Sequence, residues 1–341
     1  ARFLPSGIHG PARVTAAARP TFGSAELRAG TTRVVIIPAL GGKIASMEMG
    51  GREWLWTSDV IPHQTPIDGA SYAETADSGG YDECFPSVAA CTLPASSGRY
   101  AALSLPNAYS GLALPDHGEL WSQATTFDLR TTDEGTYAAC GWVGKRMPYR
   151  FARAIYVTAD RVEMQYAVTN DGLDRLPFLW SAQPLLPLTK NTKLELPEGA
   201  RVRVWAQHGI ELGGPGAEHR WPRAVAAGKN HDFRTPDLIA RNYACKLFVD
   251  MGTGRAAIEE EGARLEVSFD TAQVTHFGLW LNRGGWSPFA RGKGYRNLGF
   301  QPCIGAPESL TEALGQWRSA NWLEPGQTRE WTLTWRALKL L

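Results

Sequence analysis

Residues 114–121 bring two carboxylates, an imidazole and an indole together, introduced by a proline and hinged at a glycine. These groups belong to Asp116, His117, Glu119 and Trp121. An aromatic face can cover the apolar C–H side of a pyranose, while carboxylate and imidazole groups bind hydroxyls and transfer protons. The mixture is therefore suited to sugar chemistry. The alternative is a loop with solvated carboxylates, whose indole begins a core strand.

A second candidate region lies in residues 58–115, where Gly, Pro, Ser and Ala are frequent and periodicity is weak. Loops of this length in compact domains are usually functional or disordered. We favour a functional loop because Tyr81, Asp82 and Glu83 combine aromatic and acidic groups. Both carboxylates could act in a site, or could instead cap a turn or form salt bridges. His63 in the same stretch is a further candidate.

The rest of the sequence predicts the β-strands that must position these groups. The chain contains 13 Trp, 36 Gly and 22 Pro, and only 20% of its residues are charged. Frequent Gly and Pro interrupt long helices, whereas aromatic and β-branched residues favour strands. Only residues 307–316 look helical. Strands are expected over residues 32–38, 41–49, 125–130, 136–143, 149–158, 161–169, 176–181, 194–196, 202–205, 244–250, 256–260, 265–269, 275–281 and 330–337.

This pattern indicates an all-β fold, a large sandwich of antiparallel sheets, because many short strands occur without βαβ alternation. A chain of 341 residues can form one large all-β domain or two ordinary domains. No linker or composition break interrupts the sequence. We therefore expect one domain over residues 1–341, with residues 1–25 as an N-terminal arm.

Charge and composition exclude several classes of partner. With 35 basic and 34 acidic residues and no basic run among aromatics, we expect no nucleic-acid partner. No apolar stretch approaches the roughly 20 residues that cross a bilayer, so we expect no membrane partner. The five cysteines and the histidines lack metal-ligand spacing, which predicts no metal and no cofactor. We expect a cytoplasmic protein; a secreted or periplasmic location and the oligomeric state stay open.

Four segments of the chain resemble, in order, motifs of the aldose 1-epimerase (galactose mutarotase-like) family. Residues 38–47 (PALGGKIASM) are similar to its N-terminal hairpin, and residues 116–121 (DHGELW) look like its first-histidine motif. Residues 168–182 resemble its central strand pair and second-histidine motif. Residues 298–310 resemble the segment that holds its catalytic glutamate. The resemblance implies a galactose mutarotase-like β-supersandwich with the sugar site in an open cleft.

The positions of the second histidine and the catalytic glutamate correspond here to Gln183 and Gln301. Mutarotation needs a base for the anomeric hydroxyl proton and an acid for the ring oxygen. An amide can hydrogen-bond to a sugar but cannot exchange a proton near neutrality. Each acid or base group typically contributes about 10²- to 10⁴-fold in rate, so losing both should nearly abolish ordinary mutarotation. The acid nearest to Gln301 is Glu308, seven residues further on.

The resemblance gives the candidate site residues their expected roles. His117, the retained family histidine, could bind a hydroxyl or transfer a proton, or could be structural. Glu119 would share its face on a strand and could tune the imidazole or be solvated. Trp121 and Trp180 could stack on a sugar or lie in the core, and Arg291 could rim the cleft or be a surface charge. The expected catalytic set is His117, Glu119, Asp82 and Glu83, and the expected substrate-binding set is Tyr81, Trp121, Trp180, Gln183, Gln301, Trp280, Arg291 and His63.

Three functions remain open. The first, which we favour, is an aldose 1-epimerase-like isomerase that binds a sugar or glycan in a β-sandwich cleft with altered acid and base residues. The second is a polysaccharide or uronate lyase on the same scaffold. In it, Gln183 and Gln301 would neutralise the charge of the uronate carboxylate by hydrogen bonding, and His117 or Tyr81 would be the base. The third is a non-catalytic carbohydrate-binding protein.

Overall fold

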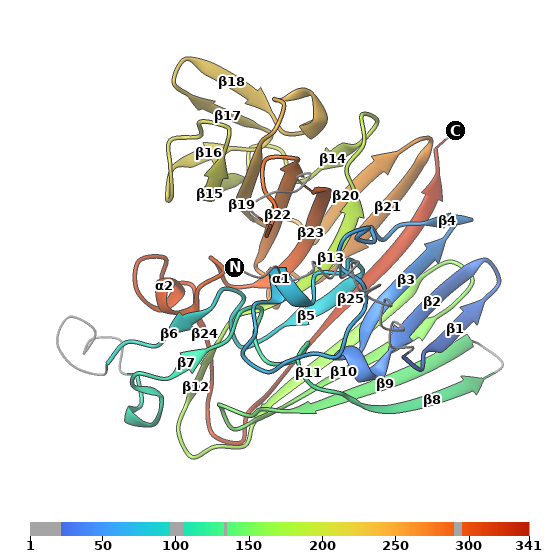
Figure 1. Cartoon of the computed structure of the whole chain (residues 1–341), viewed down its shortest axis with the longest axis vertical. Coiled ribbons are helices and arrows are strands. Elements are labelled where there is room, and N and C mark those ends of the chain that lie inside the picture. The colour runs from blue at the N-terminus through green and yellow to red at the C-terminus, as the bar shows by residue number, and fades with distance from the viewer. Residues whose placement is uncertain (1–21, 96–104, 133–134, 290–294, 341) are drawn as a thin grey trace, which may run out of the picture.

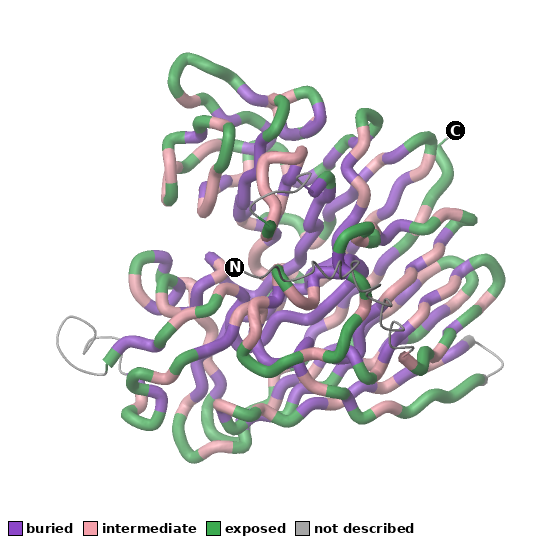
Figure 2. Tube along the Cα trace, in the orientation of Figure 1, coloured by how far each residue is buried: buried purple, intermediate pink, exposed green. Residues whose placement is uncertain are grey.

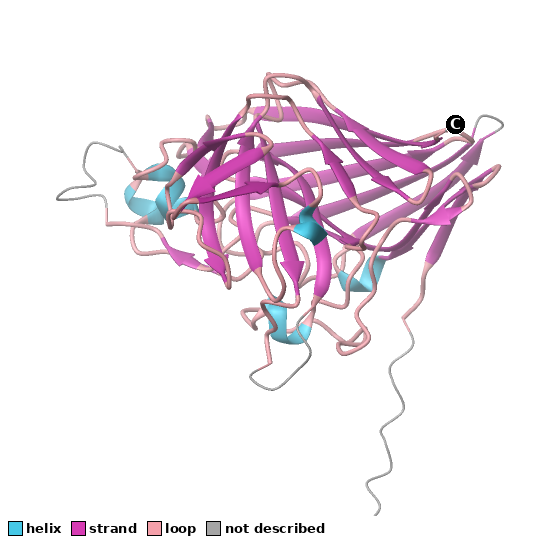
Figure 3. Ribbon diagram, turned by 90° about the horizontal axis from the view of Figure 1, so that it is seen from above, coloured by secondary structure: helices cyan, strands magenta, loops and turns pink. Residues whose placement is uncertain are grey.

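Two large antiparallel sheets face each other and form a sandwich (Figure 1). The computed structural model describes residues 22–95, 105–132, 135–289 and 295–340. Strands dominate the described part of the chain, and only short helical turns interrupt them (Figure 3). The all-β fold of antiparallel sheets expected from the sequence is therefore confirmed.

The larger sheet brings distant parts of the chain together at its centre. There β5 (Tyr81–Cys84), β13 (Trp180–Pro187) and β23 (Arg296–Ile304) lie side by side. On one side of this centre follow β3 (Lys43–Met49), β2 (Thr32–Ile37) and β1 (Ala25–Ala29), with β4 (Arg52–Glu53) paired to β3. On the other side follow β22 (His276–Arg283), β19 (Ala244–Asp250), β15 (Arg201–His208), β16 (Glu218–Arg220), β17 (Arg223–Ala226) and β18 (Lys229–Asp232).

The smaller sheet covers one face of the larger one. Its order is β14 (Lys193–Glu195), β20 (Arg255–Glu260), β21 (Ala263–Ser268), β25 (Thr328–Lys339), β11 (Val162–Asn170), β10 (Tyr149–Val157), β9 (Gly135–Val143) and β8 (Thr126–Thr132). Two small ribbons pair β12 (Leu176–Phe178) with β24 (Asn321–Leu323), and β6 (Cys91–Thr92) with β7 (Ala113–Leu114). The helical pieces are α1 (Tyr72–Thr75), α2 (Leu310–Leu314), η1 (Pro38–Leu40), η3 (Asn107–Tyr109) and η4 (Pro236–Leu238).

The core lies between the two sheets, where long strands are buried on one face (Figure 2). In β10 and β11 every second side chain is buried, and most of the intervening ones are exposed or half-buried. Tyr166 on β11 stacks on Trp331 of β25, with ring centroids 5.3 Å apart and an interplanar angle of 5°. Such aromatic pairs contribute stability beyond the apolar area that they bury.

Most segments expected as strands are strands in the structure, but residues 58–115, expected as a long loop, also contain β5, β6 and β7. The segments expected as strands over 32–38 and 41–49 form the paired strands β2 and β3. The expected helix over 307–316 shrinks to α2, because the Ser309 hydroxyl caps its first turn and Gly315 follows its last residue. The single turn of α1 was not expected, since four residues carry no periodicity.

The expected N-terminal arm over residues 1–25 ends earlier than predicted, because Ala25 already belongs to β1. Residues 1–21 of that arm lie outside the described residues. Among the described helices, none combines the length and the apolar character that crossing a membrane requires.

Candidate functional site

A cavity of about 440 Å³ opens on the face of the larger sheet that is turned away from the core. Successive side chains of a strand point to opposite faces of the sheet, so one set packs in the core and the other lines the cavity. On β22 and β23, Leu279 and Phe300 point into the core, whereas Trp280 and Gln301 line the cavity. The polar and titratable side chains around the cavity include His117, Gln183, Gln301, Asp77 and Glu308.

His117 reaches this cavity because the backbone around it is left-handed, with φ of +58° at His117 and +72° at Gly118. A Cβ added to Gly118 would lie 2.1 Å from the carbonyl oxygen of Phe85, so the close approach requires glycine. The Glu119 N–H donates to the same oxygen at 2.8 Å, and the His117 N–H donates to Val88 O at 2.5 Å. Strained residues held in this way cluster at functional sites.

Two contacts fix the orientation of the His117 ring. Its Nδ1 lies 2.9 Å from Oδ1 of Asp116, and the Tyr72 ring stacks on it with centroids 4.0 Å apart. The Tyr72 hydroxyl donates to Asp82 at 2.6 Å, and the Lys43 ammonium binds the same carboxylate. Asp82, expected as a proton-transfer group in the cleft, is instead buried behind Tyr72 and paired. Its position supports the stacked rings.

Gln183 on β13 and Gln301 on β23 both face the cavity and contact each other. The Lys246 ammonium donates to the carbonyl oxygen of Gln301, and the amide nitrogen of Gln301 donates to the carbonyl oxygen of Gln183. The Gln183 amide nitrogen lies 3.2 Å from Nε2 of His117. Because every donor in this chain points the same way, Nε2 accepts the last hydrogen bond, and Nδ1 donates to Asp116. The arrangement fits a neutral imidazole.

Two groups that line the cavity, His117 and Asp77, have raised pKa values. Burial alone lowers the pKa of His117, but the charge and hydrogen bond of Asp116, with the charges of Glu308 and Asp77, raise it overall. Burial raises the pKa of Asp77 to about 6, although the charges of Lys43 and His117 oppose this shift.

The Asp77 carboxyl group is buried and incompletely satisfied. Its Oδ1 atom has no hydrogen-bond partner among the described residues, and the residue is 7% exposed. An unpartnered buried carboxylate oxygen is costly and calls for an explanation, which a bound ligand would supply. Of the three carboxyl groups that line the cavity, Asp77 is the one with an unpartnered oxygen, because Asp116 binds His117 and Glu308 binds Lys246.

Glu308 reaches the same cavity although it follows Gln301 by seven residues. The chain turns back after β23 and returns the carboxylate to within 2.7 Å of Nζ of Lys246. The Lys246 side chain is only 3% exposed, so its charge is divided between Glu308 and the amide of Gln301. Because the Lys246 ammonium can only donate, it fixes the direction of the hydrogen bonds that run from Lys246 through Gln301 and Gln183 to His117.

The prediction that Glu119 shares a cleft-facing strand surface with His117 is wrong. The left-handed backbone between them breaks the strand alternation, and Glu119 is fully buried. Its carboxylate accepts hydrogen bonds from the Tyr149 hydroxyl at 2.8 Å and from the Arg146 N–H at 2.9 Å. Glu119 thus ties the histidine segment to the start of β10.

The predictions that Glu83, Tyr81 and Trp180 face the cleft are also wrong, because all three point into the core. Glu83 lies 3.0 Å from Nη1 of Arg153 and accepts the Trp180 indole N–H at 2.9 Å. The Tyr81 hydroxyl bonds to the Tyr166 hydroxyl at 2.9 Å. On β5 and β13, core and cavity residues alternate, and the sequence did not indicate which set was which.

His63 and Trp121, both expected to bind substrate, instead flank a separate space of about 10 Å³, too small for a sugar. The Trp121 indole N–H donates to the carbonyl oxygen of Asp116 at 2.8 Å, which braces the histidine segment. Arg291 lies outside the described residues. Of the expected binding residues, the structure brings Gln183, Gln301 and Trp280 together with His117.

The site residues that had no role in the sequence analysis include Tyr72, Asp77, Trp205, Lys246 and Glu308. Asp77 had a local signal, since it precedes Gly79 and Gly80, which both adopt positive φ at the entry to β5. An acid next to paired glycines at a strand end suggests a turn that serves a site. Lys246 carried no such signal, because nothing in β19 distinguishes a buried lysine from an exposed one.

Solved structures that align with this chain identify its two-sheet antiparallel sandwich as the galactose mutarotase-like fold. The chain shares this fold with the Slr1438 protein from Synechocystis sp. PCC 6803, with a TM-score of 0.66 and 14% identity over 95% of this chain and 99% of that one. It is also similar to a candidate aldose 1-epimerase from Escherichia coli K12, with a TM-score of 0.64 and 16% identity over 93% and 99% of the two chains.

A galactose mutarotase-like protein from Clostridium acetobutylicum aligns with a TM-score of 0.63 and 12% identity, over 92% of this chain and 95% of that one. No protein-family model matches the sequence, and no curated protein matches it significantly. At these identities the solved structures show what the fold is. The chemistry has to be argued from the side chains of the cavity.

Proposed function

We propose that the cavity binds a sugar hemiacetal and that the protein interconverts its anomers, as an aldose 1-epimerase-like isomerase with re-sited acid and base groups. The observation that carries this proposal is the pairing of Asp77 with His117. Both groups line one cavity, both have raised pKa values, and neither is an amide. An acid and a base poised near the working pH are what ring opening requires.

The proposed reaction transfers two protons and leaves the sugar otherwise unchanged. One of Asp77 and His117 removes the proton of the anomeric hydroxyl while the other protonates the ring oxygen. The bond from the anomeric carbon to the ring oxygen then breaks, and a carbonyl group forms. Rotation about the adjacent C–C bond presents the other carbonyl face, and the same steps in reverse close the ring as the other anomer.

The remaining walls of the cavity are suited to holding the sugar. Trp205, Trp280 and Trp286 line it and are half-buried, and the rings of Trp280 and Trp286 meet edge to face at 5.6 Å. Indole faces cover the apolar side of a pyranose. Gln183 and Gln301, which cannot exchange protons, would serve as hydrogen-bonding groups for hydroxyls.

The proposal is tested by exchange NMR and polarimetry on a panel of free and phosphorylated aldoses, each started as one anomer. We expect equilibration faster than in buffer for at least one sugar, with the acceleration lost in His117→Gln. A new ultraviolet absorption from unsaturated uronate, formed on uronate glycans without any anomer exchange, would indicate a lyase instead. Calorimetric sugar binding with no turnover would indicate a binding protein.

The pH dependence of kcat/KM follows from the two shifted groups, and we expect a bell-shaped profile. One group must be protonated and the other deprotonated, so activity falls when both carry their protons and when both have lost them. The acidic limb should lie near pH 6, where Asp77 titrates, and the basic limb above the ordinary pKa of histidine. Initial rates between pH 4.5 and 9.5 at constant ionic strength measure both limbs.

The Asp77→Asn variant is the control for this profile. If Asp77 gives the acidic limb, the limb near pH 6 disappears from the residual activity of this variant. A flat profile for the natural chain, or an acidic limb that survives in Asp77→Asn, would remove Asp77 from the proposed pair.

A further inference from the structure

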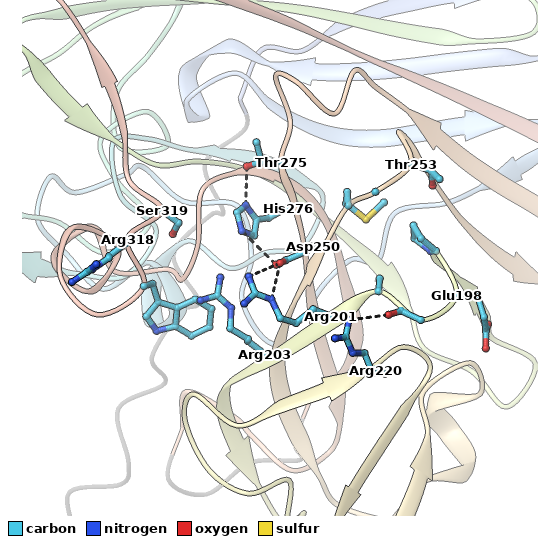
Figure 4. A pocket seen from close by; sticks show the side chains of 16 residues that line it. Glu198, Arg201, Arg203, Arg220, Asp250, Thr253, Thr275, His276, Arg318 and Ser319 are labelled. Atoms are coloured by element: carbon cyan, nitrogen blue, oxygen red, sulfur yellow. Dashed lines mark hydrogen bonds and ion pairs between the residues drawn. The ribbon is translucent and has the colours of Figure 1, made fainter.

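A second hollow, of about 990 Å³, lies on the larger sheet between β15, β19, β22 and the segment that follows α2 (Figure 4). Positive charge predominates in its lining. The positively charged side chains are Arg201, Arg203, Arg220 and Arg318, and the negatively charged ones are Glu198 and Asp250. The hollow is therefore a basic groove in a chain whose formal net charge is only +1.

Asp250 offsets only one of these arginines, because it is paired with Arg201. Its Oδ2 lies 2.7 Å from Nη2 of Arg201, and its Oδ1 lies 3.6 Å from Nε2 of His276, as the dashed lines in Figure 4 show. Burial lowers the pKa of His276 to about 4 in spite of this carboxylate. The imidazole is thus neutral at pH 7, and the positive charge of the groove comes from arginines, which do not deprotonate.

Arg203 is a half-buried arginine of the groove that has a buried, unpartnered nitrogen. Its guanidinium lies over the Trp317 ring at 4.0 Å, and its buried Nε has no hydrogen-bond partner. In the part of the chain that the structure describes, no carboxylate lies within ion-pair distance of Arg203. A planar guanidinium held flat on an aromatic ring is preorganised to bind a carboxylate with two parallel hydrogen bonds.

The groove and the sugar cavity are built from the same segments of chain. On β22, His276 lines the groove and Trp280 lines the cavity, four residues along the same strand face, or about 13 Å. On β15, Arg203 lines the groove and Trp205 lines the cavity. A small apolar cluster that includes Trp205 and Trp317 separates the two hollows. They are therefore neighbouring depressions along one face of one sheet.

We propose that this groove binds the carboxylate of an acidic sugar unit in an oligosaccharide that extends from the cavity along the sheet. The inference rests on the proposed binding of a sugar in the His117 cavity. It adds that the preferred ligands are uronate-containing oligosaccharides, recognised through Arg203 and its neighbours, in place of free neutral monosaccharides. Trp205 and Trp317 would lie beneath the sugar units between the two hollows.

Calorimetry on the intact chain tests this proposal with uronate trisaccharides of galacturonate, mannuronate and glucuronate. Each is compared with the same trisaccharide whose carboxyl groups are methyl esters, which removes the charge and keeps the sugar. We expect at least one acid form to bind about tenfold or more tightly than its ester, with affinity that falls as salt rises. Arg203→Gln and the exposed Arg318→Gln should each reduce this preference, while Arg130→Gln, on the other sheet, should not.

The proposal that the groove binds a carboxylate would be overturned if each acidic trisaccharide bound no more tightly than its methyl ester. It would also be overturned if the preference for the acid survived in both arginine variants. Binding of inorganic phosphate alone, with no gain from an attached sugar, would overturn it as well. Failure of the proposed function is distinguishable, since it appears as absent anomer exchange on neutral aldoses. An arginine-dependent preference for acids without such exchange would keep the groove and reject the isomerase. Anomer exchange without a preference for acids would keep the isomerase and reject the groove as a carboxylate site.

Discussion

Replacing Asp77 by Asn is expected to slow anomer interconversion by about 10²- to 10⁴-fold, the usual contribution of one general acid or base. The substitution keeps the size of the side chain and removes its proton exchange. Asp77 has a pKa raised to about 6 and an unpartnered oxygen, whereas the pKa of Asp116, which also lines the cavity, is lowered by the charge and hydrogen bond of His117 against the effect of burial. Glu308 is committed to Lys246, and Asp82 to Lys43.

The measurement is kcat and KM by exchange NMR on the best substrate of the panel. We expect the loss mainly in kcat, because a group that acts in the transition state contributes little to ground-state binding. Asp59→Asn, an exposed position earlier in the same loop, is the matched control and should leave both constants unchanged. A loss of less than about fivefold in Asp77→Asn, with the thermal midpoint of unfolding unchanged, would show that Asp77 is not the acid or base.

Strand alternation made most of the fold predictable from sequence. In β10 and β11 every second residue is a large apolar one except Arg153 and Asn170, and the structure pairs the two strands in register from end to end. Such a pattern specifies both the element and its buried face, because a slip of one residue would expose every core side chain. The single turns of α1 and η3 have no such period and could not be found in this way.

The site was predictable only where a motif carried it. The segment around His117 and the two glutamines could be placed by resemblance, and all three residues line one cavity. Glu119 and Glu83 could not be placed, since their positions depend on a left-handed turn and on which face of β5 packs inward. Asp77 and Lys246 derive their properties from burial by distant strands, which no local pattern records.

Replacing Arg153 by Met is expected to destabilise the fold by about 3–5 kcal/mol at pH 8, the typical cost of removing one partner of a buried ion pair. Arg153 and Glu83 are each 1% exposed and lie 3.0 Å apart between the sheets. Burial already raises the pKa of Glu83 to about 7, against the charge of Arg153 and the hydrogen bonds of Trp180 and Tyr166. Without the guanidinium, an ionised Glu83 would be left uncompensated in the core.

The sign of the pH dependence separates this explanation from simple loss of packing. A carboxyl group whose pKa is raised in the folded state destabilises the fold progressively as pH rises from its unfolded value through its folded value. The penalty of Arg153→Met should therefore be smaller at pH 5 than at pH 8, and Glu83→Gln in the same chain should make it independent of pH. Urea unfolding at both pH values measures this. Arg150→Met, on the exposed face of the same strand, is the control and should change stability only slightly. An equal penalty at both pH values would mean that lost packing, and not an unpaired Glu83, destabilises the variant.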